Sequence, residues 1–185
     1  MWQHAAVAWE DELFALLDDL EGQAEAAFAD ERDVELVDRS RAEYAAVSLT
    51  GRLMATAGQP VEVHVRGVGP VRGTLARVAR SWCLVSGHGQ EWFVPRHALV
   101  AVGGASQRAV PEVAWSPLTR LGLGSALRRI ADAGDRCLVH TLDGERYEVV
   151  LRRVGADFVE AVTGDRRSLL LVLETVAAVQ RREEG

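Results

Sequence analysis

One segment of this chain occurs twice, as two similar sequences. Residues 64–85, HVRGVGPVRGTLARVARSWCLV, return as residues 140–161, HTLDGERYEVVLRRVGADFVEA, 76 positions later and without a gap. The same offset aligns turns and apolar positions beyond the segment: Gly58 with Gly134, Leu75 with Leu151, and Val100 and Ala101 with Val176 and Ala177. Because a chance match would not keep turns and strand faces in register, the duplication predicts two units of one fold.

Each repeat begins with alternating apolar and polar residues. Val61, Val63 and Val65 are separated by polar residues, a pattern typical of a strand with one buried face. Four further short apolar runs follow, divided by tight turns, and the second repeat has the same series. We therefore expect each repeat to hold a lead helix and five short antiparallel strands, in units small enough to need shared burial.

The N-terminal third has helical composition and strong negative charge. Residues 1–57 carry 13 acidic residues against 4 arginines, whereas residues 58–185 carry 14 against 17. The apolar residues of this acidic helical arm are spaced by four and three positions and form one seam: Leu13, Leu17, Leu20, Ala24 and Ala27. The seam could pack against the strands of its own chain or against a second protein, and a kink near Glu31 is expected.

These patterns predict an α+β chain with a defined order of segments. We expect an acidic helical arm at 1–40, a first helix and barrel at 41–103, a linker at 104–115, a second helix and barrel at 116–180, and a tail at 181–185. Ser116 and Pro117 suit the start of the second helix, and Gly134 suits its end.

A helix followed by five bent strands resembles the Sm-like barrel, the fold of the bacterial RNA chaperone Hfq. The resemblance rests on VEVHVRGVGPVRGTLARVARSWCLV, with Gly73 at the bend of the second strand, on FVPRHALVAV, and on RVGADFVEAV. Asp157 stands where the family usually has aspartate, but the first repeat has Ser81 there. The second repeat has Val149 where a glycine is expected. The resemblance implies two tandem Sm-like five-stranded antiparallel β-barrels behind a long N-terminal helical arm.

The whole chain also resembles a family from high-GC Gram-positive bacteria that carries an acidic helix ahead of two such barrels. Some members are described as Fis-type regulators, a class that binds DNA through a helix-turn-helix. That motif needs two helices and a polar, basic start to the second. Residues 116–134, SPLTRLGLGSALRRIADAG, contain two glycines and lead straight into a strand, so they indicate a barrel's lead helix instead.

A candidate nucleic-acid contact lies in the first repeat. Arg96, His97 and Ala98 resemble the Lys-His-Ala that lines the RNA pore in Hfq, and Arg72 belongs to the same mildly basic repeat. At the shared offset the second repeat has Val172, Leu173 and Glu174 instead. An acidic arm also repels a phosphate backbone, so nucleic-acid binding is the less favoured interpretation.

Sequence patterns of enzymes and cofactor sites do not occur. There is no G-x-x-x-x-G-K-[ST], G-x-G-x-x-G, G-x-S-x-G, H-E-x-x-H or C-x-x-C, so no catalytic residue, metal or cofactor is expected. Cys83 and Cys137 lie in apolar alternating stretches and are expected to be buried free thiols. No apolar run is long enough to cross a bilayer, and we expect a cytoplasmic protein.

The sequence therefore favours a non-enzymatic assembly or adaptor protein. We expect a homodimer or a protein partner held through the arm seam, and a fall to monomer when residues 1–30 are removed. The open edges of the fourth and fifth strands offer a second contact, because an unpaired edge recruits another strand. The alternative is an RNA- or DNA-binding regulator that uses the first, more basic repeat.

Overall fold

The computed structural model describes residue 39 and residues 41–182. The chain divides into two compact units, Met1–Val47 and Ser48–Gly185, each considered by itself. In the first unit residues 41–45 are helical and the chain turns at Ala46. The predicted arm at 1–40 and all five seam residues, Leu13, Leu17, Leu20, Ala24 and Ala27, lie outside the described residues.

The helix expected to run on to residue 57 is interrupted at Ser48. A separate helix, α2 (Leu49–Thr56), begins there, and the Ser48 side chain accepts a hydrogen bond from the Gly51 backbone N–H at 3.0 Å. This is an N-cap, which satisfies a donor that the first turn of a helix leaves free. The linker is tied to α2, because the Arg52 side chain donates to the Ser106 carbonyl at 2.7 Å.

Ten strands follow, five in each repeat. Those of the first repeat (residues 58–103) are β1 (Pro60–Val65), β2 (Gly69–Val78), β3 (Trp82–Gly87), β4 (Gln90–Pro95) and β5 (Leu99–Gly103). The second repeat (residues 134–182) holds β6 (Arg136–Thr141), β7 (Arg146–Val154), β8 (Phe158–Thr163), β9 (Ser168–Val172) and β10 (Val176–Arg182). The helix α3 (Leu123–Ala133) precedes β6 and ends at Gly134 in the left-handed conformation with φ 72°, as the sequence predicts.

Short 3-10 helices fill the connections. They are η1 (Arg96–Ala98), η2 (Glu112–Ala114), η3 (Pro117–Arg120) and η4 (Leu173–Thr175). Ser116 and Pro117 open η3, where the Ser116 hydroxyl accepts from the Leu118 N–H at 3.3 Å. The helix expected from residue 116 is therefore two pieces, because the chain leaves helical geometry at Leu121 and Gly122 before α3 begins.

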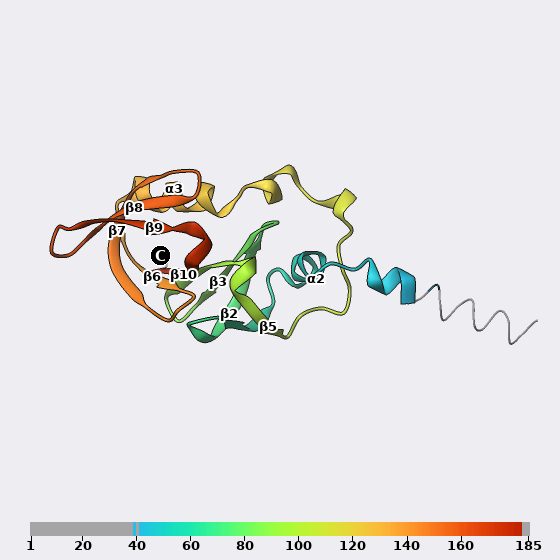
Figure 1. The fold of residues 1–185 in the computed structure, drawn as a ribbon. Coiled ribbons are helices and arrows are strands. Elements are labelled where there is room, and N and C mark those ends of the chain that lie inside the picture. Colours follow the sequence, from blue (N-terminus) through green and yellow to red (C-terminus); the bar gives the residue numbers. More distant parts are fainter. Residues whose placement is uncertain (1–38, 40, 183–185) are drawn as a thin grey trace, which may run out of the picture. The chain divides into compact units, whose positions relative to one another are not determined.

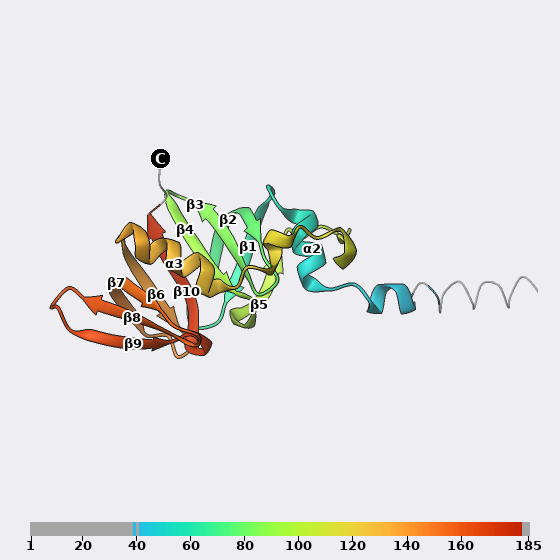
Figure 2. The same ribbon diagram turned by 90° about the horizontal axis from the view of Figure 1, so that it is seen from above.

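The strands form one open antiparallel sheet, and the expected pair of separate barrels is wrong. The order of the ten strands is β5-β1-β2-β3-β4-β10-β6-β7-β8-β9. Figure 1 shows β6 to β10 of the second repeat grouped beside β2, β3 and β5 of the first. Closing the first repeat into a barrel would require β4 to pair with β5, but β4 pairs with β10 of the second repeat. Figure 2 shows the two sets of strands joined through β4 and β10. Within each repeat the order is nevertheless the same, with the fifth strand beside the first.

The residues that lie opposite each other on neighbouring strands are equivalent in the two repeats. His64 lies opposite Ala101 and His140 opposite Ala178, and in both repeats the fifth strand has one unpaired residue just before that position. The shared offset changes once, however. Trp82 pairs with Pro95, whereas its counterpart Phe158 pairs with Val172, so the offset rises from 76 to 77 at the longer turn between β8 and β9.

This change corrects the sequence alignment at its end. The counterparts of Arg96, His97 and Ala98 are Leu173, Glu174 and Thr175, one residue later than the constant offset indicates. In the same way Val100 corresponds to Ala177, not Val176. The extra residue lies in the turn between β8 and β9, and each strand keeps its own alternation of buried and exposed residues. The alternation of apolar residues therefore does not show where the extra residue lies.

The two hydrophobic cores are interlocked. The core of the second repeat includes three residues of the first, Ala79, Trp82 and Phe93. The core of the first repeat includes Ala177 and Ala178 of β10. Neither repeat therefore completes its core from its own residues, which explains in packing terms why the strands join as one sheet.

Candidate assembly interface

Within residues 41–182, the sheet ends in two strands that each have a neighbouring strand on one side only. These strands, β5 and β9, are called the free edges. They expose large apolar side chains, with Val100 66%, Leu170 62% and Val172 49% exposed. The sequence of β9, SLLLV, carries no charge. Natural sheets usually protect such edges with charges or proline, so an apolar free edge indicates a pairing surface.

The pairing of β4 with β10 shows how such edges are covered within the chain. We call this pairing the internal joint. Val179 lies opposite Phe93, Gln180 opposite Trp92 and Arg181 opposite Glu91. The guanidinium of Arg181 donates to Glu91 at 2.6 Å and lies 5.7 Å from the centre of the Phe93 ring. Both charged side chains are largely buried, which makes this a strong, directional contact.

Each large apolar residue exposed on the free edges has a buried counterpart in the internal joint. Leu170 corresponds to Phe93, which is 6% exposed. Val100 corresponds to Ala177, which is 0% exposed. Val172 likewise corresponds to the buried Pro95. The free edges are therefore the counterparts of the two edges that meet in the internal joint: β9 corresponds to β4, and β5 corresponds to β10.

A groove runs beside the internal joint, beneath α3. It has a volume of 420 Å³ and is lined by residues of β2, β3, β4, β10 and α3, among them Trp82, Phe93 and Arg129. The Trp82 indole N–H donates to the Leu121 carbonyl at 2.9 Å, and its ring lies 5.8 Å from that of Phe93. The α3 segment thus reaches across both repeats and holds the aromatic side chains of the first against the second.

Backbone contacts at the turns show how closely the repeats approach. Gly67 has φ 73°, and a Cβ there would lie 2.4 Å from the Thr141 carbonyl oxygen of the second repeat. Leu142 of the same turn packs against the core of the first repeat. The contact leaves no room for a side chain at residue 67, so glycine is required both for the turn and for the joint.

His140 occupies the internal joint, whereas its counterpart His64 is exposed. The His140 ring lies 5.3 Å from that of Trp92, and its Nε2 is 3.2 Å from Gln180 Oε1. Because the amide oxygen only accepts, Nε2 carries the proton, and the buried Nδ1 has no hydrogen-bond partner among the described residues. Burial lowers the pKa of His140 from its usual 6.5, and the nearby Arg146 lowers it further.

The lowered pKa predicts acid sensitivity. In the unfolded chain His140 binds a proton below about pH 6.5, while in the folded chain it resists protonation, so stability falls as pH drops below that value. His140→Leu should flatten the dependence of melting temperature on pH between 8 and 5. The counterpart variant His64→Leu should leave the dependence in place, and equal slopes in both variants would count against the assignment.

The candidate nucleic-acid residues are not gathered into one site. Arg72 hydrogen bonds to Glu62, an interaction that holds the pKa of that carboxyl below its usual range, and lines a hollow that includes neither Arg96 nor His97. The His97 ring is engaged at the internal joint, with Nε2 3.0 Å from the Val176 carbonyl oxygen. Arg96 is exposed on η1. Nucleic-acid binding by these residues stays a prediction.

Both cysteines of the chain lie in the interior of the sheet. Cys83 and Cys137 are free and buried, as predicted, and burial raises the pKa of each to about 12. Across residue 39 and residues 41–182, no three His, Cys, Asp or Glu side chains are grouped so that they could hold a metal ion. No helix within the described part of the chain is both long and apolar enough to cross a membrane.

Comparison with known proteins gave no relative: no family model and no curated protein matches the chain. The sequence patterns predict contacts at the open edges of the fourth and fifth strands, but they do not predict that one such pair of edges, β4 and β10, joins within the chain. The sequence contains one signal for the internal joint, an acid and a base that each occur in one repeat only. Glu91 and Arg181 have no charged counterparts at the equivalent positions Ser168 and Gly104.

Proposed function

We propose that this protein is a non-enzymatic assembly protein in which β9 of one chain pairs with β5 of the next. The observation that carries the proposal is the contrast in exposure between Leu170 and Val100 on the free edges and their buried counterparts Phe93 and Ala177. Such an assembly would present several acidic N-terminal segments together, which raises the avidity for a protein partner. We place it in the cytoplasm, where two free thiols stay reduced.

The pairing would run head to tail. The internal joint unites the fourth strand of one repeat with the fifth strand of the other, and the two free edges are again a fourth strand, β9, and a fifth strand, β5. Carrying the register over places Leu170 opposite Val102, as Phe93 lies opposite Val179. Such heterologous contacts close into rings or extend into filaments. The resemblance to Sm-like barrels, which join edge to edge, supports the same arrangement.

Blocking one edge at a time tests the proposal. Leu170→Lys places a charge on β9, and Val100→Lys places one where the counterpart is fully buried. Each variant alone should be monomeric by light scattering, because one of the two edges is lost. An equimolar mixture should form heterodimers and grow no further, since one intact β9 and one intact β5 remain. A blocked variant that still self-associates would refute head-to-tail pairing.

Removal of residues 1–30 separates edge pairing from association through the arm seam. If the free edges carry the assembly, the number of chains in the particle should be unchanged. A fall to monomer would instead assign self-association to the seam Leu13, Leu17, Leu20, Ala24 and Ala27. Circular dichroism of the shortened chain checks that the sheet is retained in either outcome.

A further inference from the structure

A contact between a histidine ring and a backbone carbonyl lies at one end of the internal joint. At η1 of the first repeat the His97 ring Nε2 lies 3.0 Å from the carbonyl oxygen of Val176, the first residue of β10. Beside it, the Leu142 backbone N–H donates to the Thr175 carbonyl at 2.9 Å, and the Leu142 side chain packs against the core of the first repeat. His97 and Leu142, one from each repeat, thus contact consecutive backbone carbonyls, those of Val176 and Thr175.

At the free edges the counterparts of His97 and Leu142 are both charged, with opposite signs. The counterpart of His97 is Glu174, which follows β9, and the counterpart of Leu142 is Arg66, which follows β1 beside β5. The backbone confirms the second equivalence, because Arg66 donates to the Ala98 carbonyl at 2.9 Å as Leu142 does to that of Thr175. The positions held by a histidine and a leucine at the internal joint are therefore held by an acid and a base at the free edges.

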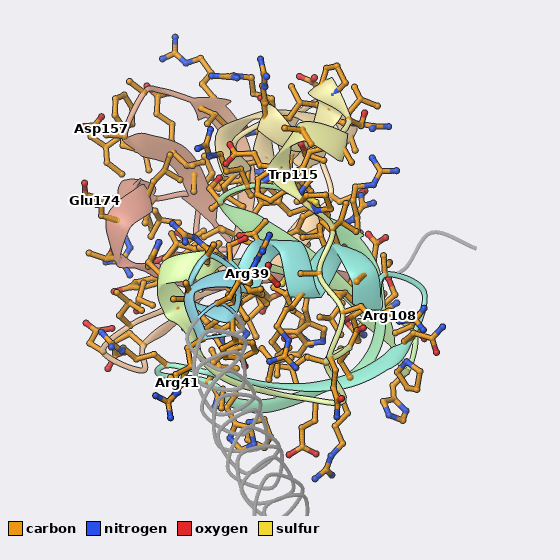
Figure 3. All side chains as sticks on the ribbon, turned by 90° about the vertical axis from the view of Figure 1, so that its right-hand side faces the viewer. Arg39, Arg41, Arg108, Trp115, Asp157 and Glu174 are labelled. Atoms are coloured by element: carbon orange, nitrogen blue, oxygen red, sulfur yellow. The ribbon has the colours of Figure 1, made fainter. Side chains whose placement is uncertain are left out.

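Both charged side chains are available to another chain. Glu174 and Arg66 are exposed, and Figure 3 shows Glu174 at the surface of η4 with its side chain directed away from the ribbon. Among the described residues neither side chain forms an ion pair. They lie at opposite ends of the strand order, beside β9 and β5 respectively, and so cannot pair within one sheet through these edges.

The adjoining turn adds a second acid on the same side. Asp143 is the counterpart of Gly67, and its hydrogen bonds from Thr141 and Glu145 lower its pKa, so it remains ionised at neutral pH. At the internal joint a Cβ at residue 67 would collide with a carbonyl oxygen. The corresponding turns of two chains must therefore stand further apart than those of the internal joint. A wider gap can be spanned by two long charged side chains such as Glu174 and Arg66, whereas the contact of the His97 ring with the Val176 carbonyl requires a close approach.

We propose that Glu174 of one chain forms an ion pair with Arg66 of the next chain and thereby selects head-to-tail assembly. The inference rests on the proposed edge pairing and specifies its direction. Every pairing in this sheet is antiparallel. Antiparallel pairing of β9 with a second β9 would place the two Glu174 carboxylates at opposite ends of the contact, and pairing of β5 with a second β5 would do the same to the two Arg66 guanidinium groups. Only the alternating order gives each of these charges a partner of opposite sign.

Charge exchange in the full chain tests this pair. Glu174→Arg and Arg66→Glu should each raise the concentration for half-assembly roughly tenfold at low salt, because each puts like charges in contact. The double variant should recover assembly, since the pair is restored with its charges reversed. A mixture of the two single variants should assemble in a 1:1 ratio, with the two kinds of chain alternating. The control Arg128→Glu makes the same change of charge on the exposed face of α3 and should have no effect.

The outcomes separate this inference from the proposal on which it rests. If the unaltered chain assembles and the single variants assemble equally well, the ion pair is refuted and edge pairing stands. If the unaltered chain is monomeric, edge pairing itself fails. Melting temperatures of all variants, expected to agree with that of the unaltered chain when measured below the assembly concentration, exclude loss of folding as the cause.

Discussion

Gly67→Ala should destabilise the chain by about 3 kcal/mol, because the substitution meets two penalties at once. The backbone has φ 73°, which disfavours any residue with a Cβ, and the new Cβ would lie 2.4 Å from the Thr141 carbonyl oxygen. The new Cβ is fixed directly to the backbone of one repeat, and the oxygen belongs to the backbone at the end of β6 in the other, so relief requires the repeats to move apart at the internal joint. Urea unfolding followed by circular dichroism measures the loss.

A glycine in the same turn provides the control for Gly67→Ala. Gly69 has φ 99°, and a Cβ there would meet nothing within 4 Å. Gly69→Ala should therefore cost only the backbone strain, about 1 kcal/mol. Equal losses in the two variants would show that the turn alone, and not contact between the repeats, sets the requirement for glycine.

Glu91→Gln should destabilise the internal joint by about 3 kcal/mol, since it leaves the Arg181 guanidinium buried without its nearest carboxylate. The two side chains are 15% and 16% exposed and their charged atoms lie 2.6 Å apart. Asp135, at 3.6 Å from Arg181 and more exposed, compensates for only part of the lost charge. The unfolding free energy in urea should fall, and the two repeats should lose stability together because their cores are interlocked.

The matched control for Glu91→Gln is Glu148→Gln. Glu148 also pairs with an arginine on a neighbouring strand, Arg136 at 3.3 Å, but both side chains are 70% exposed. An exposed pair of this kind contributes at most about 0.5 kcal/mol, so this variant should unfold almost as the unaltered chain does. A loss as large as that of Glu91→Gln would contradict the importance of burial at the joint.

The strand content of the fold could be predicted from the sequence, but the partner of β4 could not. Alternation in the run containing Val61, Val63 and Val65 tells which face is buried, because side chains alternate across a strand. It carries no information on which strand lies at each edge. Closure of each repeat and pairing between repeats are equally compatible with the alternation, and the sheet adopts the pairing that lets two incomplete cores share residues.

Two smaller errors have local causes. The residues around Ser48 have helical composition, but the Ser48 hydroxyl accepts a hydrogen bond from a backbone N–H and so begins a new helix. Helix propensity averaged over a segment does not include this side-chain hydrogen bond. The Sm-like pattern that the sequence resembles has an acid at the positions of Asp157 and Ser81. In this structure the backbone carbonyl at each position accepts a hydrogen bond: the Asp157 carbonyl from the Leu173 N–H and the Ser81 carbonyl from the Arg96 N–H, both at 2.8 Å. The side chain can therefore differ without loss of the contact.

The candidate interface could be predicted only in part. Apolar residues such as Leu170 and Val100 fit the alternation of a core strand, so the sequence gives no sign that they are exposed at the ends of a sheet. Their significance depends on knowing that Phe93 and Ala177 occupy the same positions in a covered edge. Glu174 was assigned to the wrong counterpart because the longer turn before β9 moves the alignment by one residue.

The mass of the unaltered full-length chain in solution tests the central claim most directly. Light scattering over a range of concentrations should give a discrete multiple of the 20.1 kDa chain, and Leu170→Lys should reduce it to 20.1 kDa. A mass of 20.1 kDa at every concentration, or a multimer that Leu170→Lys leaves intact, would contradict assembly through the free edges.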